Sequence, residues 1–145
     1  MSATIDRRRA AVGRLDETTI KRENENFEFH RLLTPVLKVP AKGTEARRRI
    51  ARQLLLPVIR WCEAHADKVR YCFVSPAGVY ADVHIFADYQ EYDEELGTSV
   101  AGLQIALSQA GVRANLLLDA VDSEYPLADL LTGTAPVRQV YGDPL

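Results

Sequence analysis

Apolar positions between residues 44 and 65 recur every three or four residues, which is the period of an amphipathic helix. The stripe consists of Ile50, Ala51, Leu54, Leu55, Val58, Trp61, Cys62 and His65. Arginines occupy much of the other face, so the pattern predicts a helix with one buried side. Pro57 falls inside this segment, and its ring clashes with the carbonyl of Gln53, so we expect a kink there.

A second helical stripe lies nearer the C-terminus and is formed by Leu96, Val100, Leu103, Leu107 and Ala110. Gly111 follows it, at the position where a glycine with positive φ often ends a helix. Asp88 and Glu91 have the spacing of a capping box, so we expect the helix to begin near them. Residues 114–119 are apolar on both faces, as in a buried strand, and residues 123–131 predict a short helix.

Residues 69–88 alternate with a period of two, which predicts a β-hairpin. The stretch Ser75-Pro76-Ala77-Gly78 suits a type I turn, because Ser, Pro and Gly take its first, second and fourth positions. The alternation then divides the hairpin into two faces. The apolar face, which we expect to point into the core, consists of Cys72, Val74, Val79, Ala81, Val83 and Ile85. The opposite face, called here the aromatic face, consists of Tyr71, Phe73, Tyr80, Asp82, His84 and Phe86.

Together with an extended segment at residues 27–39, these elements predict an α+β fold. The order strand, helix, strand, strand, helix, strand is the ferredoxin-like βαββαβ pattern, an antiparallel sheet with its helices on one face. Pro35 argues against a central first strand, because proline cannot donate to a sheet ladder. An α-β-β-α-β two-layer sandwich, with residues 27–39 wrapped along an edge, is the alternative.

The length of 145 residues is that of one domain. We divide it into a flexible, charged N-terminal arm or helix at residues 1–26, a single α+β domain at 27–133 and a C-terminal tail at 134–145. No apolar run is long enough to span a membrane, and no secretory signal follows the first arginines. Cys62 and Cys72 match no metal spacing, so we interpret them as buried thiols in a reducing compartment, the cytoplasm.

Charge is divided unevenly along the chain. Residues 1–72 hold 16 Lys and Arg against 9 Asp and Glu, a net charge of +7, whereas residues 73–145 hold 2 against 11, a net charge of −9. Such a polarity can complement a second copy of the chain or steer another partner, or it can simply solvate separate surfaces.

Four arginines, Arg47, Arg48, Arg49 and Arg52, fall in the first turns of the predicted helix. Cations there oppose the helix dipole, so helix propensity does not explain them. We predict that they bind an acidic protein surface; a solvated helix face and phosphate binding are the other interpretations.

The aromatic face should lie open, because a sheet with helices on one side leaves its other side uncovered. An exposed group of Tyr71, Phe73, Tyr80 and Phe86 is typical of a contact surface. It could pack against the termini of its own chain, form a dimer or heteromeric interface, or bind a ligand or nucleobases. The hairpin carries a single basic residue, Arg70, whereas phosphate binding needs clustered Lys and Arg, so nucleic acid is disfavoured.

Asp82 and His84 are the candidate catalytic residues, because they lie on one face two positions apart. A carboxylate beside an imidazole can move protons or supply two metal ligands, although the same pair can also be an ordinary surface pair. The sequence contains no nucleophile elbow, phosphate loop, dinucleotide fingerprint or zinc signature, so we expect no cofactor and no metal. We therefore expect a non-catalytic interaction or adaptor module, homodimeric through the aromatic face; the alternative is a small enzyme or ligand-binding domain centred on Asp82 and His84.

Overall fold

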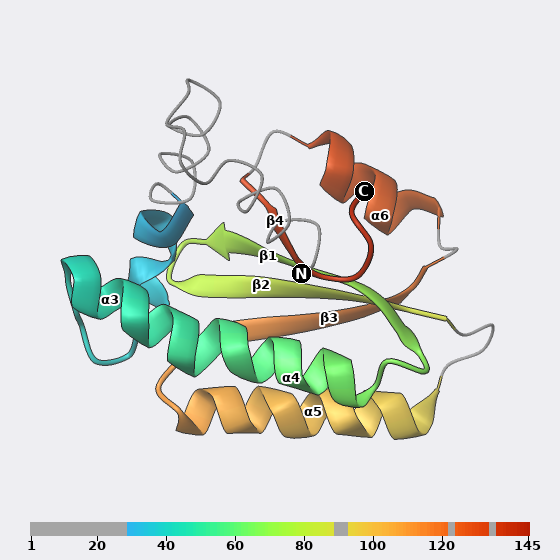
Figure 1. Cartoon of the computed structure of the whole chain (residues 1–145), viewed down its shortest axis with the longest axis horizontal. Helices are drawn as coiled ribbons and strands as arrows, with labels where there is room; N and C mark the ends of the chain where they lie inside the picture. Colours follow the sequence, from blue (N-terminus) through green and yellow to red (C-terminus); the bar gives the residue numbers. More distant parts are fainter. Residues whose placement is uncertain (1–28, 89–92, 122–123, 134–135) are drawn as a thin grey trace, which may run out of the picture.

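The computed structural model describes residues 29–88, 93–121, 124–133 and 136–145, which form a four-stranded sheet and its covering helices (Figure 1). The strands are β1 (Val69–Ala77), β2 (Tyr80–Ala87), β3 (Ala114–Ala120) and β4 (Arg138–Tyr141), in the spatial order β3-β2-β1-β4. β1 is antiparallel to both β2 and β4, whereas β3 runs parallel to β2. The α+β class is therefore confirmed, but the expected antiparallel sheet is mixed, because α5 (Glu94–Gln109) crosses over between β2 and β3.

The predicted first strand at residues 27–39 is wrong. Residues 29–33 are helical, and they continue into the 3-10 helix η1 (Thr34–Val36). The buried side chains Phe29, Leu33, Val36 and Leu37 have helical spacing, and Pro35, which has no N–H to continue the bonds of the preceding turn, lies where the helix changes to the 3-10 form. The ferredoxin-like order is therefore not confirmed, and from α3 to β3 the order is helix, strand, strand, helix, strand, before α6 (Glu124–Thr132) and β4.

The arginine-rich helix has three parts, α3 (Gly43–Ile50), the π-helical segment η2 (Ala51–Leu55) and α4 (Leu56–Ala64). The amide of Leu56 donates to the carbonyl of Ala51, five residues back. Pro57 follows in the first turn of α4, so the irregularity expected at this proline takes the form of a π-helical turn just before it.

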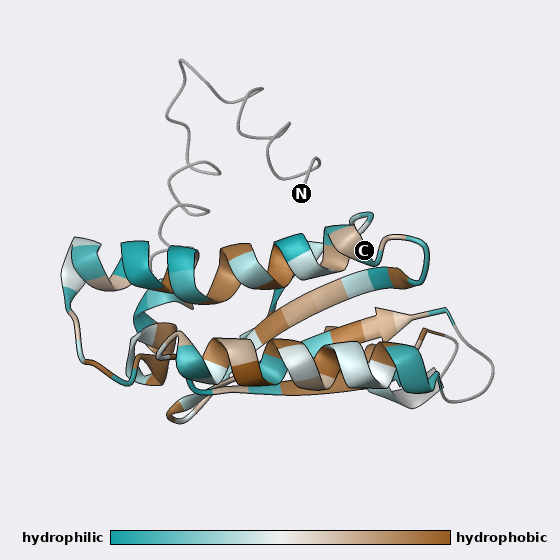
Figure 2. Ribbon diagram, turned by 90° about the horizontal axis from the view of Figure 1, so that it is seen from below, coloured by the Kyte–Doolittle hydropathy of each residue, from teal (hydrophilic) through white to brown (hydrophobic). Residues whose placement is uncertain are grey.

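The core lies between one face of the sheet and the layer of α3, α4 and α5, in which α4 and α5 run side by side (Figures 1 and 2). Five of the six residues of the predicted apolar face, Cys72, Val74, Ala81, Val83 and Ile85, are fully buried in this core, whereas Val79 lies in the hairpin loop and is 51% exposed. Cys62 and Cys72 are both buried and free, and burial raises the pKa of the Cys72 thiol. No helix in the described ranges is both long enough and apolar enough to cross a membrane.

The hairpin turn lies two residues later than predicted. Ala77 pairs with Tyr80 across a loop of Gly78 and Val79, and Gly78 has φ +65°, which a two-residue hairpin favours at its first loop position. Each β1 residue therefore faces a β2 residue four positions beyond its predicted partner, and an even shift leaves the two faces unchanged. Pro76 is tolerated because β4 pairs with β1 only as far as Val74, so the missing N–H removes no bond to that strand.

The C-terminal residues are part of the sheet. The predicted tail at 134–145 is wrong for β4, which pairs with β1 and buries Val140. Gly142 follows with φ +97°, and a Cβ atom at this position would stand 2.1 Å from the carbonyl oxygen of Arg70. Only glycine lets the chain pass so close to β1. The predicted arm at residues 1–26 lies outside the described residues.

Candidate functional site

The aromatic face is assembled from β1 and β2 by the cross-strand pairs Tyr71 with Phe86 and Phe73 with His84. Its exposure differs from the expectation of an uncovered face, because Phe73 and Phe86 are only 2% and 1% exposed. Their rings meet edge to face, with centroids 5.9 Å apart. Tyr71 is half-buried, and Tyr80 is 42% exposed. The surface available to a partner on this face is therefore limited to Tyr80 and its polar neighbours.

β3 adds to the same face, because its parallel register sets Asn115 beside Asp82, Leu117 beside His84 and Asp119 beside Phe86. Leu117 is 43% exposed, so it extends the apolar surface of Tyr80 beyond the hairpin.

A polar cluster lies in the middle of this face. The hydroxyl Oγ of Ser75 lies 3.0 Å from Nε2 of His84, and Nδ2 of Asn115 donates to Oδ1 of Asp82 over 3.3 Å. Sequence reasoning placed Asp82 and His84 here correctly but missed Ser75, because it assigned that residue to the turn. Asp82 and His84 do share one face, although the hydrogen-bond partner of His84 is Ser75.

Burial lowers the pKa of His84, and the carboxylates of Asp82 and Asp119 oppose that shift with a smaller effect. The imidazole therefore keeps its neutral form to a lower pH than a free histidine does. A neutral ring with its proton on Nδ1 can accept a hydrogen bond from the Ser75 hydroxyl at Nε2. General-base chemistry requires a hydrogen bond in this direction. Within the described residues, no three His, Cys, Asp or Glu side chains lie together as a metal site would need.

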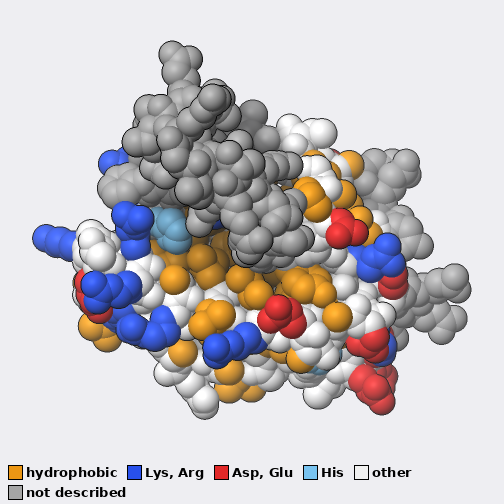
Figure 3. Space-filling view, in the orientation of Figure 1, with side chains coloured by type: hydrophobic (Ala, Val, Ile, Leu, Met, Phe, Trp, Pro, Cys, Tyr) orange, Lys and Arg blue, Asp and Glu red, His pale blue; other side chains and the backbone are white. Residues whose placement is uncertain are grey.

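The predicted arginines lie elsewhere. Arg47 and Arg48 are exposed on α3, Arg52 is exposed on η2, and Arg49 is half-buried. They belong to the helical layer, whereas the aromatic face is on the other side of the sheet, so the structure does not bring the two predicted sets together. Figure 3 shows Lys and Arg side chains gathered toward the α3 end of the molecule, and most visible Asp and Glu side chains toward the other end.

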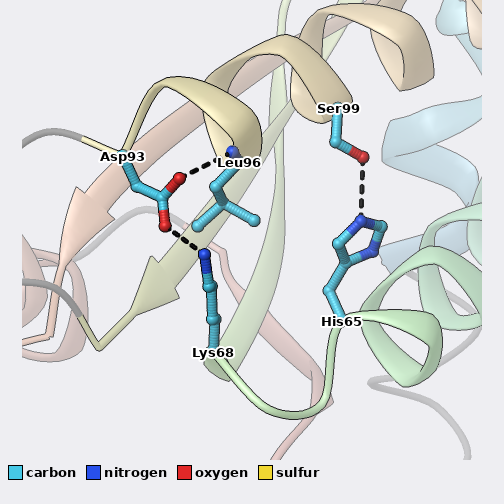
Figure 4. A network of polar contacts seen from close by, with 5 residues as sticks. All are labelled: His65, Lys68, Asp93, Leu96 and Ser99. Carbon is cyan, nitrogen blue, oxygen red and sulfur yellow. Dashed lines mark hydrogen bonds and ion pairs between the residues drawn. The ribbon is translucent and has the colours of Figure 1, made fainter.

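A second serine–histidine pair joins α4 to α5 (Figure 4). The indole Nε1 of Trp61 donates to Oγ of Ser99 over 2.9 Å, and the same oxygen lies 2.9 Å from Nε2 of His65. Nδ1 of His65 lies 2.8 Å from the carbonyl oxygen of Trp61, which can only accept. Nδ1 therefore carries the proton, and in the neutral ring Nε2 accepts from the Ser99 hydroxyl. The two rings also stack, with centroids 4.3 Å apart.

The start of α5 is held beside this pair. Asp93 caps the helix by accepting the amide of Leu96 over 3.0 Å, and its other oxygen binds the ammonium of Lys68 (Figure 4). The bond to Lys68, followed by that amide, lowers the pKa of Asp93, and the bond to Asp93 raises the pKa of Lys68. The expected helix start at Asp88 is wrong, because that carboxylate instead binds Arg70 at 2.6 Å; Glu91 lies outside the described residues.

The network of Trp61, His65 and Ser99 was not foreseen. Trp61 and His65 share one predicted stripe, but Ser99 lies 38 and 34 residues beyond them, and no local period connects it to them. All three side chains are half-buried and bond or stack with one another, so the network connects the end of α4 to α5.

Comparisons with known protein families, with curated proteins and with solved structures find no match for this chain. Its function has to be inferred from the geometry of these surfaces and clusters.

Proposed function

We propose that this chain is a non-catalytic protein-interaction module that self-associates along the β3 edge of the sheet, where α5 lies on one side and the exposed Tyr80 and Leu117 lie on the other. The observation that carries the proposal is an exposed surface without charge. From Leu96 to Val112 the chain has no Asp, Glu, Lys or Arg, although Ala101, Gly102 and Ala106 are exposed and Ile105 is 58% exposed. The outer face of a helix in contact with water normally carries charged side chains.

The aromatic face supports the same proposal through its exposed members. Tyr80 and Leu117 lie on the β2–β3 part of the face, around the half-buried Asp82 and His84. Apolar side chains with a polar rim are typical of surfaces that bind other proteins. We assign the module to the cytoplasm, because its two described cysteines are free thiols.

The test is the mass of the protein in solution, measured by sedimentation equilibrium. We expect a dimer or larger assembly at about 100 μM, which corresponds to an association free energy of only about 5.5 kcal/mol. Ile105→Lys places a charge on the uncharged surface and should weaken the assembly. Val39→Lys is the matched control, because Val39 is also an exposed aliphatic residue but lies in the segment before α3. A wild-type protein that remains monomeric at this concentration would overturn the proposal.

The exposed arginines favour an acidic protein as an additional partner. Arg47, Arg48 and Arg52 are exposed on α3 and η2, whereas the uncharged surface belongs to a different helix, α5. Binding of such a partner, or contact with the acidic part of another copy, should weaken as salt rises and when Arg47, Arg48 and Arg49 are changed to Gln. Association that both treatments leave unchanged would exclude a contribution of these arginines to binding.

A small enzyme or ligand-binding domain is the second candidate, favoured by the bond between Ser75 and His84 with Asp82 nearby. A thermal-shift screen of metal ions, nucleotides and common metabolites tests it, because a bound ligand raises the melting temperature. A compound that stabilises the wild type but not His84→Asn would favour this candidate. A compound that stabilises both equally would bind elsewhere.

A further inference from the structure

β3 is an edge strand, and half of its backbone groups point away from the sheet. The amide of Ala81 donates to the carbonyl of Arg113, and the amide of Val121 donates to the carbonyl of Ala87. Odd-numbered residues of β3 and its flanks therefore direct their N–H and C=O groups toward β2. The even-numbered residues, which are Ala114, Leu116, Leu118 and Ala120, direct theirs outward.

Gln104 of α5 occupies the first part of this edge. Its side-chain amide donates to the carbonyl of Ala114, and its Oε1 accepts the amide of Leu116 over 3.0 Å. A peptide group of a neighbouring strand would make the same two bonds. The outward groups that remain are the amide of Ala114, the carbonyl of Leu116 and both groups of Leu118 and of Ala120, and none of them bonds another described residue.

The remaining donors and acceptors of one β3 edge can pair with those of the same edge in a second copy. We propose that β3 pairs antiparallel with β3 of a second copy, around a two-fold axis at Leu118. Each Leu118 then donates to, and accepts from, Leu118 of the other copy, and each Ala120 amide donates to the Leu116 carbonyl of the other copy. Four hydrogen bonds then cross the axis, and only the Ala120 carbonyls receive no donor from the other copy, because Gln104 holds the Leu116 amides that face them. The inference rests on the proposed function, because it names the contact through which the module self-associates.

The neighbouring registers are less favourable. An axis at Leu117 sets Leu116 opposite Leu118 and Ala114 opposite Ala120. Gln104, which holds the Leu116 amide and the Ala114 carbonyl, would then block four bonds of the pairing, against two with the axis at Leu118. An axis at Asp119 sets the two Asp119 carboxylates directly opposite each other, where like charges repel. The axis at Leu118 instead sets Leu117 opposite Asp119 of the second copy.

The surroundings of the edge fit a second copy. Edge strands are usually protected by lysines, prolines or bulges, yet the only charge in β3 is Asp119. The uncharged surface of α5 flanks the same edge, since Gln104 reaches β3 from that helix. Its exposed Ala101 and Gly102 are small enough to let two helices approach.

Disulfide crosslinking of the full chain tests the pairing. Leu118→Cys places two thiols at the axis, where facing Cα atoms of a hydrogen-bonded pair lie about 5.5 Å apart, within disulfide range. Asn115→Cys is the matched control on the same strand, because the axis holds its two copies far apart. At about 100 μM protein, where the dimer is expected, Leu118→Cys should crosslink roughly tenfold faster, from an effective concentration of about millimolar. Both variants keep Cys62 and Cys72, so the wild type gives the background rate.

A charge at position 117 tests the register. Leu117→Lys should keep the dimer, because the ammonium would face Asp119 of the second copy. If instead the two aromatic faces meet, the same lysine should disrupt the dimer. A dimer that Leu117→Lys abolishes, or that Leu118→Cys fails to crosslink, overturns the pairing and leaves the proposed function standing. A monomeric wild type overturns both.

Discussion

Gly142→Ala is the substitution that tests most directly whether β4 is docked on β1. A Cβ atom at this position would lie 2.1 Å from the backbone oxygen of Arg70 and 3.0 Å from Cδ1 of Tyr71. The positive φ of +97° costs a side-chain-bearing residue about 1–2 kcal/mol by itself. The clash adds to this, because the nearest atom belongs to the backbone of β1 and not to the end of a flexible side chain, so the chain itself would have to shift.

The alternative open to the variant is to release β4, which would expose Val140 and forfeit about 1.5–3 kcal/mol of burial. By either route we expect a loss of about 3 kcal/mol in the free energy of unfolding. Urea denaturation, followed by the fluorescence of Trp61, measures it at low protein concentration. Trp61 is the only tryptophan in the chain, so the signal has one source.

Gly102→Ala is the matched control, because a Cβ atom there meets nothing within 4 Å and Gly102 lies inside α5. It should stabilise the protein by about 0.5–1 kcal/mol through helix propensity. If Gly142→Ala changes stability by less than about 0.5 kcal/mol, as an ordinary surface substitution does, the docking of β4 is refuted.

Three further predictions concern the polar clusters, all measured by urea denaturation. Ser99→Ala should cost about 1–2 kcal/mol, because the indole of Trp61 loses its acceptor, whereas its exposed neighbour in Thr98→Ala should cost little. Because the pKa of Asp93 is lower in the folded state, its carboxylate stabilises the fold above the pKa of the unfolded state, and this stabilisation is lost as pH falls through the pKa of the folded state. Asp93→Asn should therefore destabilise the protein at neutral pH and have the same stability as the wild type in strong acid. The lowered pKa of His84 makes the unfolded state bind more protons, so stability should fall as pH drops below about 6.5, and His84→Asn should remove that part of the slope.

The sequence predicted those parts of the fold that depend on local periodicity. The stripes of the arginine-rich helix and of α5, and the two faces of the hairpin, follow from side chains a few residues apart. The prediction of an extended segment failed from Phe29 to Leu37, because the residues that are buried there have helical spacing. The C-terminal strand failed because its four residues are too few to show a period.

The candidate site was predicted less completely, because it depends on register and on distant contacts. Asp82 and His84 were placed correctly, since an even shift of the turn keeps the faces. Ser75 was missed because the predicted turn began at this residue, whereas the observed turn lies two residues later and leaves Ser75 within β1. The parallel position of β3 brings Leu117 and Asp119 to the same face, and no pattern within β3 determines which strand it joins.

The π-helical segment η2 has a geometric consequence for the helix that contains it. The buried side chains of this helix are spaced by four residues throughout: Ala46, Ile50, Leu54, Val58 and Cys62. In a regular α-helix, four residues exceed one full turn by about 40°. Over the four intervals between these five residues, the stripe would rotate by about 160° around the helix axis and would no longer face the sheet. A π turn is wider, so the same four residues fall short of a full turn and rotate the stripe back. η2 therefore rotates the buried stripe back toward the sheet. One side of the long helix stays on the core, and Arg47, Arg48 and Arg52 stay on the other side.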